Sequence, residues 1–152
     1  MEAIFNYKCA NEKQTIEFGK KLAQIAKKGD IFLLNGTLGM GKTTLSRSFI
    51  QALTNAEEVP SPTFTLLQTY ETDAFEIYHF DLYRIKSPEE IFEIGIEEAM
   101  YEGVSLIEWP EKMEGYLPRR AFNLTITPDK NSGRNIEIKV TEEDKRTRLE
   151  KL

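Results

Sequence analysis

The stretch from residue 33 to 47, LLNGTLGMGKTTLSR, constrains the fold of this chain more than any other. Residues 36–43 within it match the full pattern G-x-x-x-x-G-K-[ST]. The apolar run DIFLLN comes directly before the motif, and the helical periodicity of TTLSRSFIQAL follows it. A buried strand, a glycine loop and a helix in this order predict a phosphate-binding loop in an α/β fold.

The residues of this loop suit a nucleoside triphosphate and its metal ion. Glycines let the backbone curl so that successive N–H groups face phosphate oxygens. The backbone cradle comprises Gly36, Gly39, Met40 and Gly41. Lys42 supplies positive charge to the β- and γ-phosphates, and the Thr43 hydroxyl is a candidate ligand of Mg²⁺. The alternative, a glycine-rich turn beside a surface lysine, is disfavoured by the flanking strand and helix.

Two β-rich runs downstream indicate a mixed sheet. Residues 64–71 and 75–81 are separated by Thr72-Asp73-Ala74 and predict a hairpin, whose strands pair antiparallel. An earlier strand is expected at AIFNYK, followed by a helical period over residues 12–28. We therefore expect an α/β fold, a single-domain P-loop NTPase with a mixed β-sheet flanked by helices.

The length of the chain favours one domain. Its 152 residues, 40% of them hydrophobic, can bury one substantial core but are too few for two ordinary domains. We assign residues 1–140 to the P-loop ATPase domain. The remaining segment, residues 141–152, mixes charges of both signs with few apolar residues, which favours a solvated, charged C-terminal tail.

Acidic residues stand near the ends of two predicted strands. The apolar run VSLIEW carries Glu108, and FEIYHFDLYR carries Asp81. Ligands of open α/β sheets gather at the carboxyl ends of the strands. Glu108 is therefore our candidate for Mg²⁺, and Asp81 for ordering the attacking water or the waters of the metal ion. With Lys42 they form the predicted catalytic set, and a surface carboxylate or helix cap is the alternative for each acid.

A third polar candidate lies between the loop and Asp81. Pro60 and Pro62 hold the backbone extended around Ser61. The hydroxyl of Thr63, which follows, can sense a γ-phosphate or its metal ion.

Two aromatic residues near the acids each allow two interpretations. His79 is the only histidine and alternates with Tyr78 and Phe80 on a strand, so we favour a packed or partner-facing role over that of a catalytic base. Trp109 follows Glu108 directly. It is either a core aromatic or a neighbour of the nucleotide.

Composition restricts the partners and the compartment. The net charge of −5 provides no broad positive field for a phosphate backbone, so a partner protein is expected to hold most of any nucleic acid. A single cysteine, Cys9, excludes an intramolecular disulfide and a multi-cysteine metal site. The chain shows neither a signal-peptide pattern nor an apolar run near the ~20 residues of a membrane span. We expect a cytoplasmic protein without membrane contact.

Four ordered motifs carry a resemblance to a known family. GTLGMGKTTLSR, SPTFTL, YHFDLYR and LIEWPEK resemble, in order and spacing, the bacterial TsaE family, also called YjeE. The resemblance runs from QTIEFGKKLA to SGRNIEI. It implies a Mg²⁺-dependent ATPase that serves the synthesis of threonylcarbamoyladenosine at position 37 of tRNA. It also implies two protein partners, TsaD, which transfers the threonylcarbamoyl group, and TsaB, which pairs with it.

The resemblance further implies roles for individual residues. Thr43 and Glu108 stand at Mg²⁺, while Thr63 and Asp81 fall in segments that act as switches. The implied ATP-binding residues are Thr15 near the base, then Gly39, Gly41, Lys42, Thr43, Thr44, Thr63, Asp81, Lys112 and Arg134. The chain departs from the usual family pattern at Thr37, where an acid is common, and at Met40, where a small residue is common.

Two other classes of protein share the phosphate cradle. A small-molecule P-loop kinase normally needs a lid with several arginines, and only Arg119 and Arg120 cluster here. A GTP-dependent switch needs a guanine-reading N-K-x-D segment, whereas this chain has PDKN. The ATPase is therefore preferred, with the kinase as the alternative.

Overall fold

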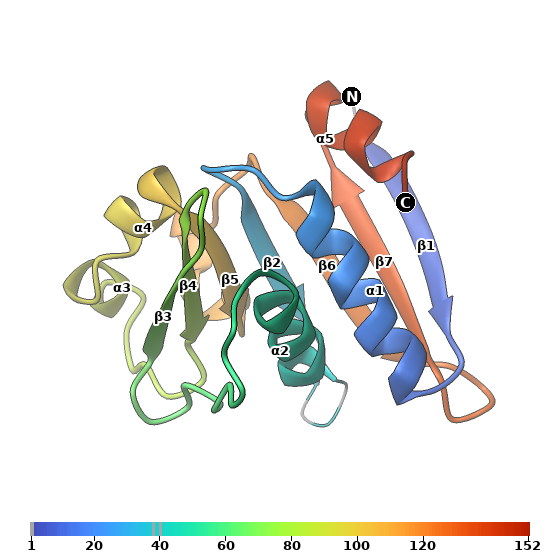
Figure 1. The fold of residues 1–152 in the computed structure, drawn as a ribbon. Coiled ribbons are helices and arrows are strands. Elements are labelled where there is room, and N and C mark those ends of the chain that lie inside the picture. Colours follow the sequence, from blue (N-terminus) through green and yellow to red (C-terminus); the bar gives the residue numbers. More distant parts are fainter. Residues whose placement is uncertain (1, 38, 40) are drawn as a thin grey trace.

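A seven-stranded mixed sheet forms the centre of the fold (Figure 1). The computed structural model describes residues 2–37, 39 and 41–152. Its strands are β1 (Ala3–Cys9), β2 (Ile31–Asn35), β3 (Leu67–Glu71), β4 (Glu76–Asp81), β5 (Val104–Glu108), β6 (Phe122–Pro128) and β7 (Arg134–Val140). Its helices are α1 (Glu12–Ile25), α2 (Lys42–Leu53), α3 (Glu90–Glu93), α4 (Ile96–Glu102) and α5 (Glu143–Leu149), with 3₁₀ turns η1 over Pro110–Tyr116.

The strand order confirms the predicted mixed sheet. The order is β1-β7-β6-β2-β5-β4-β3. β2 pairs in parallel with β5 and with β6, and β4 pairs in parallel with β5. The pairs β3–β4, β6–β7 and β1–β7 are antiparallel, and β3–β4 is the expected hairpin. The phosphate-loop strand β2 therefore lies in the middle of the sheet, between two parallel neighbours.

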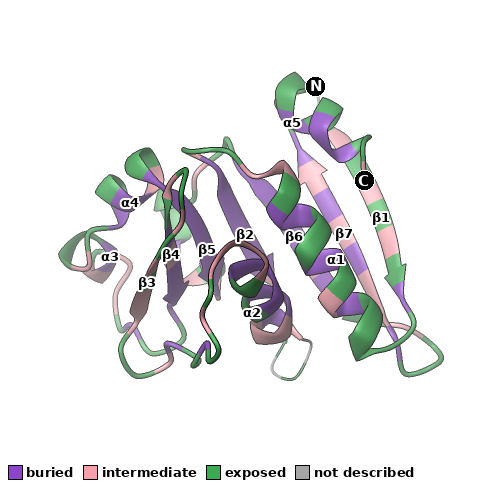
Figure 2. Cartoon of the chain, in the orientation of Figure 1, coloured by how far each residue is buried: buried purple, intermediate pink, exposed green. Residues whose placement is uncertain are grey.

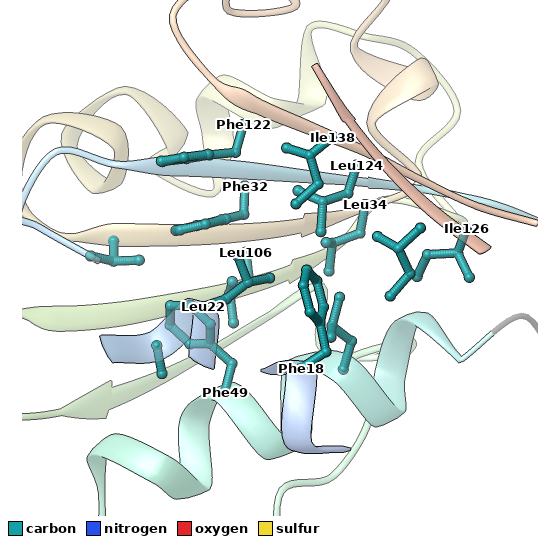
Figure 3. Close-up of a cluster of buried hydrophobic side chains, with 14 of the residues drawn as sticks. Phe18, Leu22, Phe32, Leu34, Phe49, Leu106, Phe122, Leu124, Ile126 and Ile138 are labelled. Atoms are coloured by element: carbon teal, nitrogen blue, oxygen red, sulfur yellow. The ribbon is translucent and has the colours of Figure 1, made fainter. Parts of the chain in front are cut away.

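Burial on both faces explains why β2 reads as one continuous apolar run. Figure 2 shows this strand buried along most of its length. Side chains alternate across a strand, so Phe32 and Leu34 enter the core beneath α1 and α2, together with Phe49 (Figure 3). Ile31 and Leu33 enter a second core on the opposite face, beside residues of α3, α4 and η1. This arrangement fixes β2 and holds the loop that leaves its carboxyl end.

The C-terminal segment differs from the solvated tail expected over residues 141–152. α5 packs against the sheet, and Arg148 and Leu149 are buried. The Arg148 guanidinium donates to both carboxylate oxygens of Asp30, at 2.6 and 3.0 Å, and also to the Ile25 carbonyl. The positive charge of Arg148, which in the sequence suggests a solvated tail, is therefore neutralised by Asp30, a residue distant in the sequence.

Within the portion of the chain that the structure describes, no helix combines the length and the apolar character needed to cross a membrane.

Candidate nucleotide and metal site

A cleft of about 500 Å³ opens at the carboxyl ends of the parallel strands β2, β4 and β5. This volume lies within the usual range for small-molecule sites, roughly 300–1,000 Å³. The predicted residues that line it are Thr15, Gly39, Gly41, Lys42, Thr43, Thr44, Thr63, Asp81, Glu108 and Arg134. The sheet edge therefore gathers residues from widely separated parts of the sequence.

Two described glycines of the phosphate loop come directly before or at the start of α2. Gly39 and Gly41 have φ of 82° and 90°, in the left-handed region that favours glycine. Gly41 is the N-cap of α2 and has no side chain to accept from the first-turn N–H groups. Those N–H groups and the positive end of the helix dipole form an anion site.

Lys42 is held on the floor of the cleft by two contacts. Its Nζ donates to the Gly36 carbonyl at 2.6 Å and lies 3.3 Å from the centroid of the Trp109 ring. The side chain is buried, which lowers the pKa of Lys42 from its ordinary value, although nearby carboxylates, Glu108 foremost, act in the opposite direction. Trp109 thus lines the cleft and also packs beside the second core.

Glu108 connects the phosphate loop to the hairpin. Its Oε1 accepts a hydrogen bond from the Thr43 hydroxyl at 3.0 Å, and its Oε2 lies 2.6 Å from His79 Nε2. All but 2% of Glu108 is buried, and His79 is fully buried. The sequence pattern predicted a packed role for His79 but not this contact. The available signal was the two-residue spacing from Asp81, which puts both side chains on the same face of β4.

Asp81 lies opposite Glu108 in the register of β4 and β5. Its Oδ2 accepts from the Thr63 hydroxyl at 3.0 Å, and its Oδ1 accepts from the Tyr83 backbone N–H at 2.9 Å. The Thr63 hydroxyl is also 2.8 Å from the Ser61 hydroxyl. The two segments that the sequence associates with the γ-phosphate are therefore joined directly to each other.

The far end of the cleft is formed by α1 and the β6–β7 turn. Thr15 Oγ1 donates to the Asn11 carbonyl at 3.4 Å. Arg134 Nη2 donates to the Gly39 carbonyl at 3.2 Å and so connects this turn to the phosphate loop. Several further lining residues were not predicted from the sequence, namely Asn11, Glu12, Ser132 and Gly133.

Three predicted residues stand apart from the described lining. Gly36 contributes only its carbonyl, to Lys42. Lys112 lies in η1, where its backbone N–H donates to the Trp109 carbonyl, and its side chain is not part of the lining that the structure describes. Met40 lies outside the described residues.

The donor set around Thr43 fits a magnesium ion that arrives with phosphates. Thr43 and Glu108 offer a hydroxyl and a carboxylate, and Asp81 lies on the adjacent strand, so every donor is an oxygen, as Mg²⁺ prefers. Among residues 2–37, 39 and 41–152, no group of three or more His, Cys, Asp or Glu side chains could hold a metal ion. Mg²⁺ at nucleotide sites typically uses one or two carboxylates plus phosphates and water, which matches this sparse set.

Comparisons with known proteins agree with this geometry. A family model described as "Threonylcarbamoyl adenosine biosynthesis protein TsaE" matches residues 9–136. A tRNA threonylcarbamoyladenosine biosynthesis protein TsaE from Rickettsia felis is 54% identical over 119 residues, which cover 76% of this chain and 70% of that protein. The protein of the same name from Haemophilus influenzae is 38% identical and covers 90% of this chain and 96% of its own.

The fold has a close counterpart among solved structures. A crystal structure of YdiB from Bacillus subtilis superposes with a TM-score of 0.83 at 27% sequence identity, over 99% of this chain and 95% of that one. A matching family model, relatives that align over most of their length and a shared α/β architecture lead to one conclusion. The chain belongs to the TsaE family of tRNA threonylcarbamoyladenosine biosynthesis proteins.

Proposed function

We propose that this protein binds ATP with Mg²⁺ in the cleft and hydrolyses it, as the cytoplasmic ATPase subunit of the machinery that makes threonylcarbamoyladenosine in tRNA. The observation that carries the proposal is the hydrogen bond between the Thr43 hydroxyl and the Glu108 carboxylate, at the first turn of the phosphate-loop helix. Family membership supports the pathway. The phosphate-loop residues that line the cleft support the binding of a nucleotide.

Each group then has a specific role. The first-turn N–H groups of α2 and the Lys42 ammonium bind the phosphates, while Thr43 and Glu108 hold the magnesium ion. Magnesium, when bound, supplies positive charge to the β- and γ-phosphates. Asp81, oriented by Thr63 and by the Tyr83 N–H, accepts a hydrogen bond from the attacking water and aligns it.

The partners follow from the pathway and from charge. We propose that the protein acts on the TsaB–TsaD pair and meets tRNA only through that complex. Its net charge of −5 supports this division, because direct tRNA binding would need neutralising cations.

Placement of the arginines argues against a small-molecule kinase. Arg119 lines a separate hollow with Leu33, Pro118 and Lys139, away from the nucleotide cleft. A kinase lid would have to bring such cations over the transferred phosphoryl group.

The test follows radioactive phosphate from [γ-³²P]ATP. With magnesium, TsaB and TsaD present, label should appear as inorganic phosphate, and excess ATP should compete better than excess GTP. A Glu108→Gln variant should bind ATP in the absence of magnesium as the unmodified protein does, but release little phosphate. Transfer of label to an added metabolite would instead establish a kinase, and no nucleotide binding at all would overturn the proposal.

A further inference from the structure

His79 lies between the sheet and the phosphate-loop helix. β4 places it opposite Leu106 of β5 and on the same face as Ile77. Ile77 and Leu106 belong to the core that includes Leu45 and Phe49 of α2 (Figure 3 shows Leu106 beside Phe49). His79 is fully buried in this layer, so its polar atoms depend on protein partners.

The two imidazole nitrogens have very different surroundings. Nε2 lies 2.6 Å from Glu108 Oε2. Nδ1 is buried and has no hydrogen-bond partner among the residues that the structure describes. An unpaired buried polar atom destabilises the folded protein, and a leucine or phenylalanine at this position would avoid that cost. Packing alone therefore does not account for a histidine here, whereas the contact with Glu108 does.

Each of the two carboxylate oxygens of Glu108 has its own partner, from a different element. Thr43 of α2 donates to Oε1, and His79 of β4 contacts Oε2. A carboxylate near a metal ion can rotate about its last side-chain bonds unless a second group holds it. A carboxylate accepts and does not donate, so the imidazole proton belongs on Nε2.

We propose that His79 is the positioning residue for Glu108: its Nε2–H fixes one carboxylate oxygen and thereby keeps the other directed at Thr43 and the magnesium ion. This inference rests on the proposed function, because it assigns Glu108 to that ion. The contact also connects Glu108 of β5 to β4, the neighbouring strand that carries Asp81.

The first test concerns the proton on the imidazole and needs no nucleotide. His79 is the only histidine of the chain, so its signals in a long-range ¹H–¹⁵N spectrum of the ¹⁵N-labelled protein assign themselves. We expect the proton on Nε2 and a bare Nδ1. A Thr43→Ala variant, which leaves the imidazole contact intact, should keep this pattern, and Glu108→Leu, which removes the acceptor of the imidazole proton, should change it. A proton on Nδ1, or a spectrum unaltered in Glu108→Leu, would overturn the positioning role.

The second test separates metal binding from nucleotide binding. Calorimetry with ATP in EDTA and ATP with Mg²⁺ should show that His79→Leu binds the metal-free nucleotide normally but loses about 10- to 100-fold of the gain from magnesium. His79→Gln retains a side-chain N–H donor and should recover most of that gain. Tyr70→Phe also removes a buried polar atom without a described partner and should behave as the unmodified protein.

These outcomes distinguish the two proposals. A protein that binds no ATP would overturn the proposed function, while the position of the imidazole proton would still decide whether His79 holds Glu108. Equal magnesium dependence in His79→Leu and the unmodified protein would overturn the positioning role alone. Should His79→Leu fail to fold, the position of the imidazole proton in the unmodified protein and in Glu108→Leu still decides the question.

Discussion

At the scale of single residues, the most informative arrangement is Lys42 between a carbonyl and an indole ring. Trp109 has a left-handed backbone, with φ of 60° and ψ of 49°, directly after Glu108. Such a conformation costs a bulky residue on the order of 1–3 kcal/mol, and such residues cluster at functional sites. The turn brings the ring face over the ammonium, so the end of β5 positions both the Glu108 carboxylate and the lysine.

Lys42→Ala should weaken ATP binding. The variant removes a buried cation that the remaining backbone dipoles replace only in part, and hydrogen bonds to charged groups contribute about 1.5–3 kcal/mol, or roughly 10- to 150-fold in Kd. Titration calorimetry measures the change. Lys21→Ala, on the exposed side of α1, is the control and should leave Kd unaltered. An unchanged Kd in Lys42→Ala would show that Lys42 does not contribute to ATP binding.

The positions of Lys42, Thr43 and Glu108 at the cleft could be predicted from the sequence because each depends on a local pattern. A glycine loop fixes where its own lysine and threonine lie, and a buried strand points its last carboxylate toward the same edge. The two-residue spacing of His79 and Asp81 indicates a shared face of β4, but the contact of His79 with Glu108 also depends on the register of β4 against β5, which no local pattern specifies. Lys112 illustrates the converse, because family position alone did not predict that η1 carries its side chain outside the described cleft lining.

At the scale of elements, two hydrogen bonds connect the segment before β3 to Asp81 at the end of β4. The Thr63 hydroxyl donates to the Asp81 carboxylate, and the Asp81 backbone N–H donates to the Leu66 carbonyl at 3.0 Å. Leu66 itself has a positive φ of 68°. A change at Asp81 on loss of the γ-phosphate would therefore reach residues 61–66, where Phe64 is 81% exposed.

Thr63→Ala and Asp81→Ala should separate nucleotide binding from turnover. Both variants keep the phosphate loop, so ATP affinity should stay within about threefold, a difference below 1 kcal/mol. Turnover stimulated by TsaB and TsaD should fall at least tenfold, because the water is no longer aligned. Thr65→Ala, an exposed neighbour, serves as the control. Parallel loss of affinity and turnover would show that the pair binds nucleotide and does not act on the water.

The attachment of α5 leads to a stability prediction. Arg148→Met leaves the buried Asp30 carboxylate without its guanidinium, and breaking a buried pair in this way costs about 3–5 kcal/mol. Urea denaturation should show a lower midpoint with the same slope. Arg146→Met, which breaks only the exposed pair with Glu150, should cost about 0–1 kcal/mol. If the two variants are equally stable, α5 contributes little to the fold.

Elements with strong periodicity were predictable, and those held by distant partners were not. α1, β2, α2 and the hairpin each carry their own pattern of apolar residues. α5 does not, because a short charged segment reads as solvated until Asp30 is known to lie beside it. The energy that makes it helical comes from tertiary contacts.

At the scale of the whole molecule, the cleft lies at the edge of one continuous sheet and has few cations among its described lining residues. Among the described lining residues of the cleft, Arg134 is the only arginine. Its guanidinium donates hydrogen bonds to the backbone carbonyls of Gly133 and Gly39. P-loop enzymes gain much of their rate from an added cation and a well-aligned water.

We therefore expect slow ATP hydrolysis by the isolated protein and faster hydrolysis with TsaB and TsaD. Partners that bind the triphosphate-bound arrangement more tightly stabilise it, which also orders the water. Steady-state phosphate release, measured alone and with both partners, gives the ratio, expected to exceed about tenfold. Equal rates under conditions where gel filtration shows the three proteins together would contradict this mechanism.

The position of β1 has a consequence for how the chain folds. In the sheet that the structure describes, this edge strand pairs only with β7, so β1 cannot join the sheet before β7 has formed. Pairings between distant segments form slowly, because the entropy of closing a long loop is lost before the contacts that stabilise it can form. During synthesis β2 and α2 can assemble early, whereas β1 joins the sheet only once the β6–β7 hairpin has left the ribosome. Until then Phe5 and Tyr7, which pack against the finished core, have no surface to cover them.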